Sequence, residues 1–463
     1  MSAHSLLSEA AMRQMEPGKL LVLGFSGGPD SAAALHALHA AGWPLLAAHL
    51  DHGLRPESAQ DAEAAAAMAA GYGVGFASRR VDVAARAGAE GQTIEEAARA
   101  ARYAFLFELA HAQDAQAVVV AHHADDQAET IVMHLLRGAG PQGLHGMQAH
   151  WLPNPWSERV ALVRPLLAAS RADVLAYCQA HGLETLTDPS NQDPAYFRNK
   201  VRHELLPLLE QFAPGVKTRL VHTGELLAAE EAVLQAEGQA AWRRCLAAAG
   251  PSYVALQRSA LQSQPLALQR RVLRRAAQAL RPHSGELSFA LVEQAREGLN
   301  EEGGPYDWFE GLVILVEGER LWLAERSAQL PVAWPQAPEA TVHLEAGVSV
   351  PLGPGWKLRL DEVQPAAAPT GDVYEAWLDA ERIGGELTLR RPRPGDRMAL
   401  AQGTQKLSDV FINAKLPQRA RAAWPLLCKG DEVVWAPGLR LAHGYVAQVG
   451  MPALHARVVS VGE

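Results

Sequence analysis

Residues 26–31, with the sequence SGGPDS, have the types and spacing of an anion-binding loop. They lie between an apolar run at 20–25, typical of a buried strand, and an alanine-rich stretch at 32–41, typical of a helix. A loop that joins a strand to a helix points backbone N–H groups and the positive end of the helix dipole at one spot. Glycines let an anion approach the backbone, serines add hydroxyl donors, and Asp30 suits a Mg²⁺ ion that accompanies a phosphate.

A simpler interpretation is a tight turn in which Asp or Ser caps the following helix, but a cap does not require two glycines and two serines around one Asp. No G-x-x-x-x-G-K-[ST] segment occurs, so no lysine is expected at a γ-phosphate. The pattern resembles the SGGxDS loop of the ATP pyrophosphatases, which split ATP into AMP and pyrophosphate. The resemblance implies that ATP is bound by Ser26, Gly27, Gly28, Pro29, Asp30 and Ser31.

Polar clusters follow two further apolar runs, at 51–58 (DHGLRPES) and at 122–130 (HHADDQAET). Caps of the following helices explain an isolated Asp or Ser in such places, but not two His, two Asp and a Glu within eight residues. We expect both clusters to meet the 26–31 loop at one edge of a sheet. A dinuclear Mn²⁺ or Zn²⁺ site of a phosphoesterase is an alternative, although it leaves the glycine-serine loop unexplained.

Repeated strand–helix units must position these groups. Strands are predicted at 20–25, 44–50, 76–83 and 117–121, and helices at 57–70 and 93–111, with Thr93 and Glu96 as a capping box. The helix after the fourth strand should bury Ala128, Ile131, Val132, Leu135 and Leu136. This alternation predicts an α/β fold with a doubly wound parallel sheet, in which ligands bind at the carboxyl ends of the strands.

The chain changes character near Pro214. Residues 216–280 are rich in Ala, Leu, Gln and Glu and are predicted to be helical, a hairpin is expected over 311–323, and 330–338 reads as a linker. Short β patterns follow. We therefore expect a catalytic α/β domain at 1–215, a mainly helical middle domain at 216–330, and a small α+β domain at 331–463.

Composition excludes several classes of protein. The 463 residues carry a net charge of −9, contain no long apolar run and begin without a secretory signal, which predicts a cytoplasmic protein without a membrane segment. The cysteines Cys178, Cys245 and Cys428 lie far apart, so no zinc or iron–sulfur site is expected. Basic residues nevertheless gather at 198–219 and 390–421, which favours a polyanion as partner.

A more specific resemblance comes from the sequences of several motifs and from their order along the chain. The chain resembles the tRNA(Ile)-lysidine synthetase family in the 26–31 loop, in DHGLRPES, and at 95–106, 121–147, 164–171 and 188–202. A weaker resemblance to the same family is found at 406–411 and 421–438. Residues 151–160 look like an insertion and are expected to form a surface loop. The resemblance implies that ATP adenylates C2 of the wobble cytidine in an isoleucine tRNA with a CAU anticodon. Free L-lysine then displaces AMP.

The resemblance also implies roles for particular residues. Asp30 would hold Mg²⁺, while Arg102, His122, Asp126 and Glu129 would line the cytidine and lysine site. Either carboxylate would bind the lysine ammonium and accept its proton, and the sequence does not decide which. From spacing alone, the favoured interpretation of Arg102 is a surface charge on an amphipathic helix.

The basic segments supply the candidates for tRNA contact, which are Arg198, Lys200, Arg202, Arg390, Arg391, Arg393 and Lys406. The alternative is that they are solvated charges. Other functions that remain open are a tRNA thiolase of the same superfamily and a non-catalytic RNA-binding protein. The sequence leaves the oligomeric state open, a homodimer being one alternative.

Overall fold

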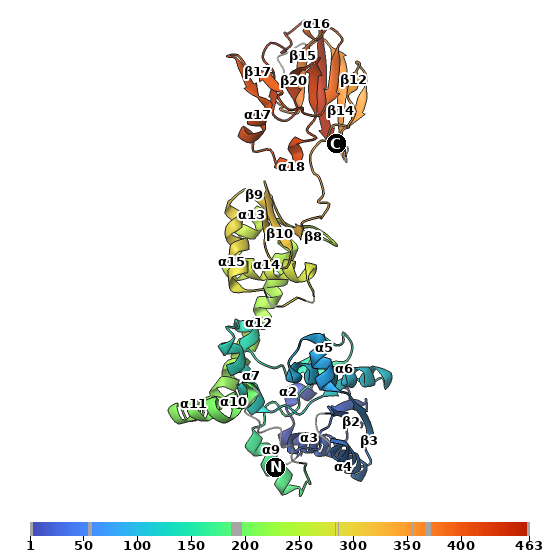
Figure 1. Cartoon of the computed structure of the whole chain (residues 1–463), viewed down its shortest axis with the longest axis vertical. Helices are drawn as coiled ribbons and strands as arrows, with labels where there is room; N and C mark the ends of the chain where they lie inside the picture. The colour runs from blue at the N-terminus through green and yellow to red at the C-terminus, as the bar shows by residue number, and fades with distance from the viewer. Residues whose placement is uncertain are drawn as a thin grey trace. The chain divides into compact units, whose positions relative to one another are not determined.

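The computed structural model describes residues 3–53, 58–186, 197–282, 284–285, 287–353, 355–365 and 372–460. The chain divides into two compact units, Met1–Gln235 and Ala236–Glu463 (Figure 1). Two parts of the motifs named above, 54–57 and 188–196, lie outside the described residues. The domain boundaries at 215 and 330 remain predictions.

The first unit is built around a sheet with the strand order β3-β2-β1-β4-β6-β5. All neighbours pair in parallel except β5, which runs antiparallel to β6. This confirms the predicted doubly wound α/β class. The strands are β1 (Leu21–Gly24), β2 (Leu45–Asp51), β3 (Gly75–Arg80), β4 (Ala117–Val119), β5 (His150–Trp151) and β6 (Ala161–Val163).

Strand β1 is buried on both faces. Leu21 and Leu23 belong to one hydrophobic cluster with α3 and α9, whereas Val22 belongs to another with α6. A central strand with two covered faces reads as a continuous apolar run, which is why the sequence identified it. The helices of this unit are α1 (Ala3–Leu6), α2 (Glu9–Met12), α3 (Pro29–Ala40), α4 (Ser58–Gly71), α5 (Val83–Glu90), α6 (Ile94–Ala112), α7 (Ala124–Leu136), α8 (Pro141–Leu144), α9 (Arg171–Ala180), α10 (Phe197–Lys200), the π-helical turn η2 (Val201–Leu205), α11 (Leu206–Phe212) and α12 (Val216–Cys245).

Helix α6 has the predicted capping box of Thr93 and Glu96. The prediction for α7 was wrong at its end, because Leu135 and Leu136 are each 57% exposed, while Ile131 is buried. The buried apolar stripe does not reach the last two residues of the helix, which ends at Leu136.

The strand order reverses direction between β1 and β4. From β1 the chain continues to β2 and β3 on one side, while β4 and β6 extend the sheet on the other. At such a switch point the loops after the two strands diverge and leave a crevice outside their carboxyl ends. The 26–31 loop follows β1 and the HHADD segment follows β4, so the two polar groups predicted to meet are neighbours at this edge.

One secondary-structure prediction for the middle of the chain was wrong. The helix predicted over 216–280 ends at Cys245 and gives way to the hairpin β7–β8, because Gly250 and Pro251 form a turn before the β-favouring Tyr253 and Val254. The hairpin expected over 311–323 is confirmed by the pairing of β10 with β11. The elements are β7 (Leu246–Gly250), β8 (Tyr253–Gln257), α13 (Arg258–Gln262), α14 (Leu266–Leu280), α15 (Phe289–Glu297), the 3₁₀ turn η3 (Gly298–Asn300), β9 (Gly303–Asp307), β10 (Leu312–Glu317) and β11 (Arg320–Glu325).

The rest of the second unit has a hydrophobic cluster of its own, drawn from residues 344–458. Two sheets enclose it, with the orders β12-β16-β19-β20-β17-β18 and β13-β14-β22-β15. The elements are β12 (Val342–Leu344), β13 (Ser349–Pro351), β14 (Trp356–Val363), β15 (Glu375–Asp379), α16 (Ala380–Ile383), β16 (Leu387–Arg390), β17 (Arg397–Ala399), β18 (Thr404–Lys406), α17 (Leu407–Asn413), α18 (Gln418–Arg421), β19 (Leu426–Lys429), β20 (Glu432–Ala436), β21 (Arg440–Leu441) and β22 (Ala453–Ser460). Across the described ranges, no helix combines the length and apolar character needed to cross a bilayer.

Candidate active site

The loop after β1 has the geometry of an anion site. Gly28 is the N-cap of α3, and Gly27 has φ of 77°, a conformation that L side chains rarely adopt. A Cβ on Gly27 would lie 2.6 Å from Cδ1 of Leu186, so this side chain would have to shift, and the positive φ is what requires glycine. The Ser31 hydroxyl donates to the Gly28 carbonyl at 3.0 Å and lies 3.2 Å from the Ser26 hydroxyl. The first turn of α3 therefore presents backbone N–H groups and hydroxyls at one place.

Asp30 stands in the first turn of α3. Its Oδ1 is buried and has no hydrogen-bond partner among the described residues, although Nε2 of His123 lies 3.8 Å away. Burial raises the pKa of Asp30, and the charges of His123 and Arg171 oppose that effect. An unpartnered carboxylate oxygen beside an anion-binding loop suits Mg²⁺, which binds through one or two carboxylates together with substrate phosphates. The described residues contain no group of three or more His, Cys, Asp or Glu arranged to hold a metal by themselves.

His123 follows β4 and its Nε2 lies 3.8 Å from Oδ1 of Asp30, which follows β1; we predicted a site role for its neighbour His122 and not for His123. It is the N-cap of α7: its Nδ1 accepts the N–H of Asp126 at 3.3 Å, and Asp126 accepts the His123 N–H at 3.0 Å. Because Nδ1 is an acceptor, a neutral His123 carries its proton on Nε2, which faces Asp30. The Asp three residues after His123 was the available signal, since it completes a capping box.

Asp126 and Glu129 form a buried charge cluster with two arginines. Glu129 is 1% exposed, accepts from Nε of Arg198 at 2.8 Å, and accepts from Nε of Arg202 at 2.6 Å. Oδ1 of Asp126 accepts from both guanidinium groups, at 3.1 and 2.8 Å. Burial alone would raise the pKa of Asp126, but His123, His122 and Arg198 outweigh it and hold the pKa at about 2.

Arg198 and Arg202 reach the same carboxylates because of the local helix geometry. They lie four residues apart on α10 and η2, where the N–H of Leu206 donates to the carbonyl of Val201, a π-helical turn. Pro207 explains this turn, since it lacks an N–H and its ring would clash with a carbonyl one α-helical turn earlier. We predicted both arginines as tRNA contacts, and the structure places them in ion pairs with the candidate catalytic carboxylates.

Arg102 and His122 complete the cluster. Nδ1 of His122 and Nε of Arg102 are buried and have no hydrogen-bond partner in the part of the chain that is described. Burial holds the pKa of His122 well below its usual value; Asp126 opposes this, whereas Arg164, Arg198 and Arg102 add to it. His122 is therefore a neutral imidazole. Burial lowers the pKa of Arg102, and among the charges around it Arg198 lowers the pKa further while Asp126 raises it.

The other candidates for RNA contact differ in how accessible they are. Lys200 in the first unit and Lys406 in the second are exposed. Arg390 is 3% exposed and makes a bidentate pair with Asp396 at 2.8 and 2.9 Å. A polyanion would have to break this pair to reach it, so we retain Arg391, Arg393 and Lys406 as candidates but not Arg390.

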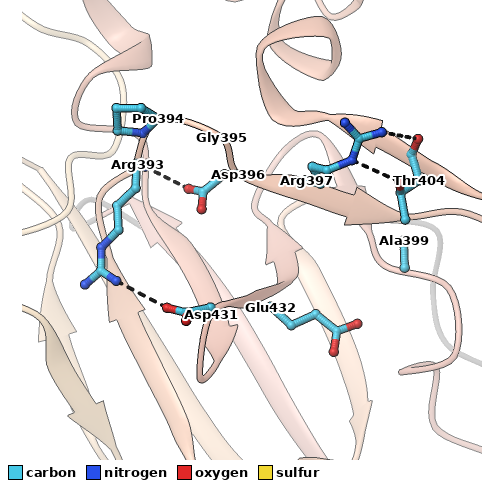
Figure 2. A pocket seen from close by; sticks show the side chains of 9 residues that line it. All are labelled: Arg393, Pro394, Gly395, Asp396, Arg397, Ala399, Thr404, Asp431 and Glu432. Atoms are coloured by element: carbon cyan, nitrogen blue, oxygen red, sulfur yellow. Dashed lines mark hydrogen bonds and ion pairs between the residues drawn. The ribbon is translucent and has the colours of Figure 1, made fainter.

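Arg393 lines a cavity of about 540 Å³ in the second unit, shown in Figure 2. Its guanidinium reaches Asp431 at 3.5 Å, and its backbone N–H donates to Asp396 at 2.7 Å. Across the cavity wall, Nε of Arg397 donates to Oγ1 of Thr404 at 3.0 Å. The lining mixes both signs of charge, and Arg393 stays 56% exposed, so its charge is accessible from solvent.

Two family models match parts of this chain. A PP-loop domain family matches residues 4–209, and a TilS substrate C-terminal domain family matches residues 387–457. A U34-tRNA thiolase from Methanococcus maripaludis superposes on 49% of this chain and 76% of its own, with a TM-score of 0.40 and 20% identity.

Curated relatives cover nearly the whole chain. The tRNA(Ile)-lysidine synthase of Symbiobacterium thermophilum is 37% identical over 450 residues, which are 92% of this chain and 90% of the relative. That of Geobacter sulfurreducens is 36% identical over 434 residues, covering 92% of this chain and 89% of the relative. Identity of this extent is accompanied by both family matches and by the loop at the end of β1. The chain belongs to the tRNA(Ile)-lysidine synthase family.

Proposed function

We propose that this chain is a tRNA(Ile)-lysidine synthase, an ATP-dependent ligase that forms lysidine at the wobble position of an isoleucine tRNA. One observation carries the proposal: the SGGPDS loop after β1 lies beside the carboxylate–arginine cluster after β4 in a chain 37% identical to such an enzyme over most of its length. The family assignment favours this function over the thiolase and phosphoesterase alternatives.

The loop would bind the triphosphate of ATP. The first turn of α3 supplies N–H groups, and Ser26 and Ser31 supply hydroxyls, for the diphosphate that leaves. Asp30 would hold Mg²⁺, which when bound offsets the negative charge that builds up on the phosphates. This fits the unpartnered oxygen of Asp30.

The first step would join cytidine to AMP. The C2 carbonyl oxygen of the wobble cytidine bonds to the α-phosphorus, the bond from that phosphorus to the bridging oxygen breaks, and pyrophosphate departs. Arg102, which has a buried and unpartnered Nε, is the group we assign to the anionic part of this adenylate. The role fits a guanidinium that makes no ion pair with a described residue.

The second step would transfer lysine. The bound ammonium first gives up one proton, because only the neutral ε-amine has a lone pair. The amine then bonds to C2, the bond from C2 to the AMP oxygen breaks, and the nitrogen loses a second proton. We assign binding of the lysine ammonium to Asp126 and Glu129, which already hold cationic side chains. Asp126 is a poor proton acceptor because its pKa is about 2. We assign proton acceptance to His122 on geometry alone, because its buried Nδ1 has no described partner, although burial lowers its pKa as well.

Exposed basic residues would bind the body of the tRNA. Lys200, Arg391, Arg393 and Lys406 are the candidates that the described structure leaves accessible. Phosphate contacts of this kind release counterions, so affinity should fall steeply with salt. We place the reaction in the cytoplasm, in keeping with three cysteines that are all unpaired thiols.

The test is incorporation of labelled lysine. The purified protein is incubated with ATP, Mg²⁺, labelled L-lysine and an isoleucine tRNA transcript with a CAU anticodon, and label in RNA is counted. A matched transcript with uridine in place of the wobble cytidine is the control. We expect label in the first RNA and none in the second; label in neither, or equally in both, would refute the proposal.

A further inference from the structure

The segment between β5 and β6 is a surface loop, as predicted, and its own side-chain hydrogen bonds hold its turn. Asn154 fixes it: the side-chain amide donates to the carbonyls of Trp151 and Val160, at 3.2 and 2.9 Å. Its Oδ1 accepts the N–H groups of Trp156 and Ser157, both at 3.0 Å. These four bonds determine where the Trp156 side chain leaves the backbone.

Trp156 packs on helix α6. Its ring is stacked on that of Tyr103, with centroids 4.2 Å apart and planes at 19°, and on Phe107 at 5.4 Å. The Tyr103 side chain is fully buried. Aromatic stacking of this kind favours one relative orientation of the rings over others. Trp156 therefore holds one face of the Tyr103 ring, and core residues pack around the rest of it.

Two guanidinium groups lie near the Tyr103 ring. The central carbon of Arg99 lies 4.9 Å from the ring centroid and that of Arg102 lies 5.7 Å from it, both within cation–π range. Within the described residues, Arg102 makes no hydrogen bond and no ion pair. Arg198 and Arg202 differ, because carboxylates fix them. Among the interactions of the described residues, the Tyr103 ring is thus the group that we take to orient Arg102.

We propose that Trp156 is a positioning residue for the ligation reaction, which holds Arg102 in place through the Tyr103 ring. The inference rests on the proposed function, in which Arg102 faces an anionic part of the substrate. A guanidinium tethered only by a ring keeps its hydrogen-bonding fork free for that anion. The cost is that its position depends on whatever orients the ring, which here includes the 151–160 turn.

The test compares two substitutions of similar bulk. Trp156→Phe keeps a flat ring that stacks, whereas Trp156→Leu fills space without stacking, and Glu158→Ala changes an exposed residue of the same turn as a control. Lysine ligation is measured at saturating concentrations of all substrates to give kcat. The ATP concentration is then varied to give KM for ATP. Because small misplacements of a catalytic group cost about 10- to 100-fold in rate, we expect Trp156→Leu to lower kcat by about 10-fold or more. Trp156→Phe and Glu158→Ala should stay near wild type, and KM for ATP should not change.

Two further measurements guard against an unfolded variant. Asn154→Ala loosens the turn without altering a ring and should also lower kcat at unchanged far-UV circular dichroism. In an Arg102→Lys background, measured by single turnover, Trp156→Leu should cause no further loss. Equal kcat for the Leu and Phe variants, an unchanged kcat in Asn154→Ala, or the full loss in the Arg102→Lys background would each overturn the inference. A wild-type protein that transfers no lysine would instead refute the proposed function.

Discussion

Asp126 is the residue whose substitution should reveal most about the charge cluster. One oxygen of its carboxylate accepts the N–H of His123 and completes the helix cap, while the other accepts from Arg198 and Arg202. Asp126→Asn keeps one acceptor oxygen and removes the charge. The amide cannot serve both the cap and the guanidinium groups, so one set of bonds is lost.

The magnitude follows from the pKa. The pKa of Asp126 is about 2 in the folded protein, against its ordinary value of 3.8. At 1.36 kcal/mol per unit, this corresponds to about 2 kcal/mol of stability. Because the folded pKa is the lower one, the contribution is complete above pH 3.8 and is lost as the pH falls toward 2.

The assay is equilibrium unfolding in urea between pH 3 and 7. Hydrogen exchange of the α7 amides is measured separately over the same pH range. Asp173→Asn is the matched control, since Asp173 completes the capping box of α9 in an exposed position without arginine partners. We expect Asp126→Asn to lose about 2 kcal/mol at pH 7 and less below pH 4, and the control to lose about 1 kcal/mol or less. Equal losses in the two variants, or a loss at pH 3 as large as at pH 7, would refute the argument.

Four further outcomes are expected. Gly27→Ala should weaken ATP binding and lower stability by about 1–2 kcal/mol, because alanine must adopt a left-handed conformation; unchanged affinity in a calorimetric titration would contradict this. Asp30→Ala should abolish pyrophosphate release while tRNA binding persists, and wild-type turnover would remove Asp30 from the mechanism. Arg391→Ala with Arg393→Ala should weaken tRNA binding and lower its salt slope by about one per lost phosphate contact, with ATP affinity unchanged. Arg390→Ala should instead cost about 3–5 kcal/mol in an unfolding assay, because it leaves Asp396 buried and unpaired; normal stability would contradict that role.

The sequence predicted the catalytic sheet well because its signals are local. Strand β1 is apolar on both faces, the SGGPDS loop contains its own glycines, and the capping box of α6 lies within four residues. Parallel pairing of β1 with β4 then follows from the topology rules for alternating strands and helices. The family resemblance named the same positions and is confirmed by relatives over most of the chain.

Contacts between residues distant in sequence could not be predicted in this way. Arg198 pairs with Glu129 across 69 residues, and nothing in the basic run at 198–202 distinguishes an ion pair from a phosphate contact. Arg390 is similar, since only the fold shows that it is buried against Asp396. The role of Trp156 depends on stacking with Tyr103, which lies on a different element.

The central claim is that the turn between β1 and α3 binds the diphosphate that leaves ATP. A crystal structure with an ATP analogue that cannot be cleaved between its α- and β-phosphates, grown with Mg²⁺, tests it most directly. We expect the β- and γ-phosphates to lie against the N–H groups of residues 27–31, and the metal to lie at Asp30. Analogue bound elsewhere on the protein, or phosphates turned away from this turn, would contradict it.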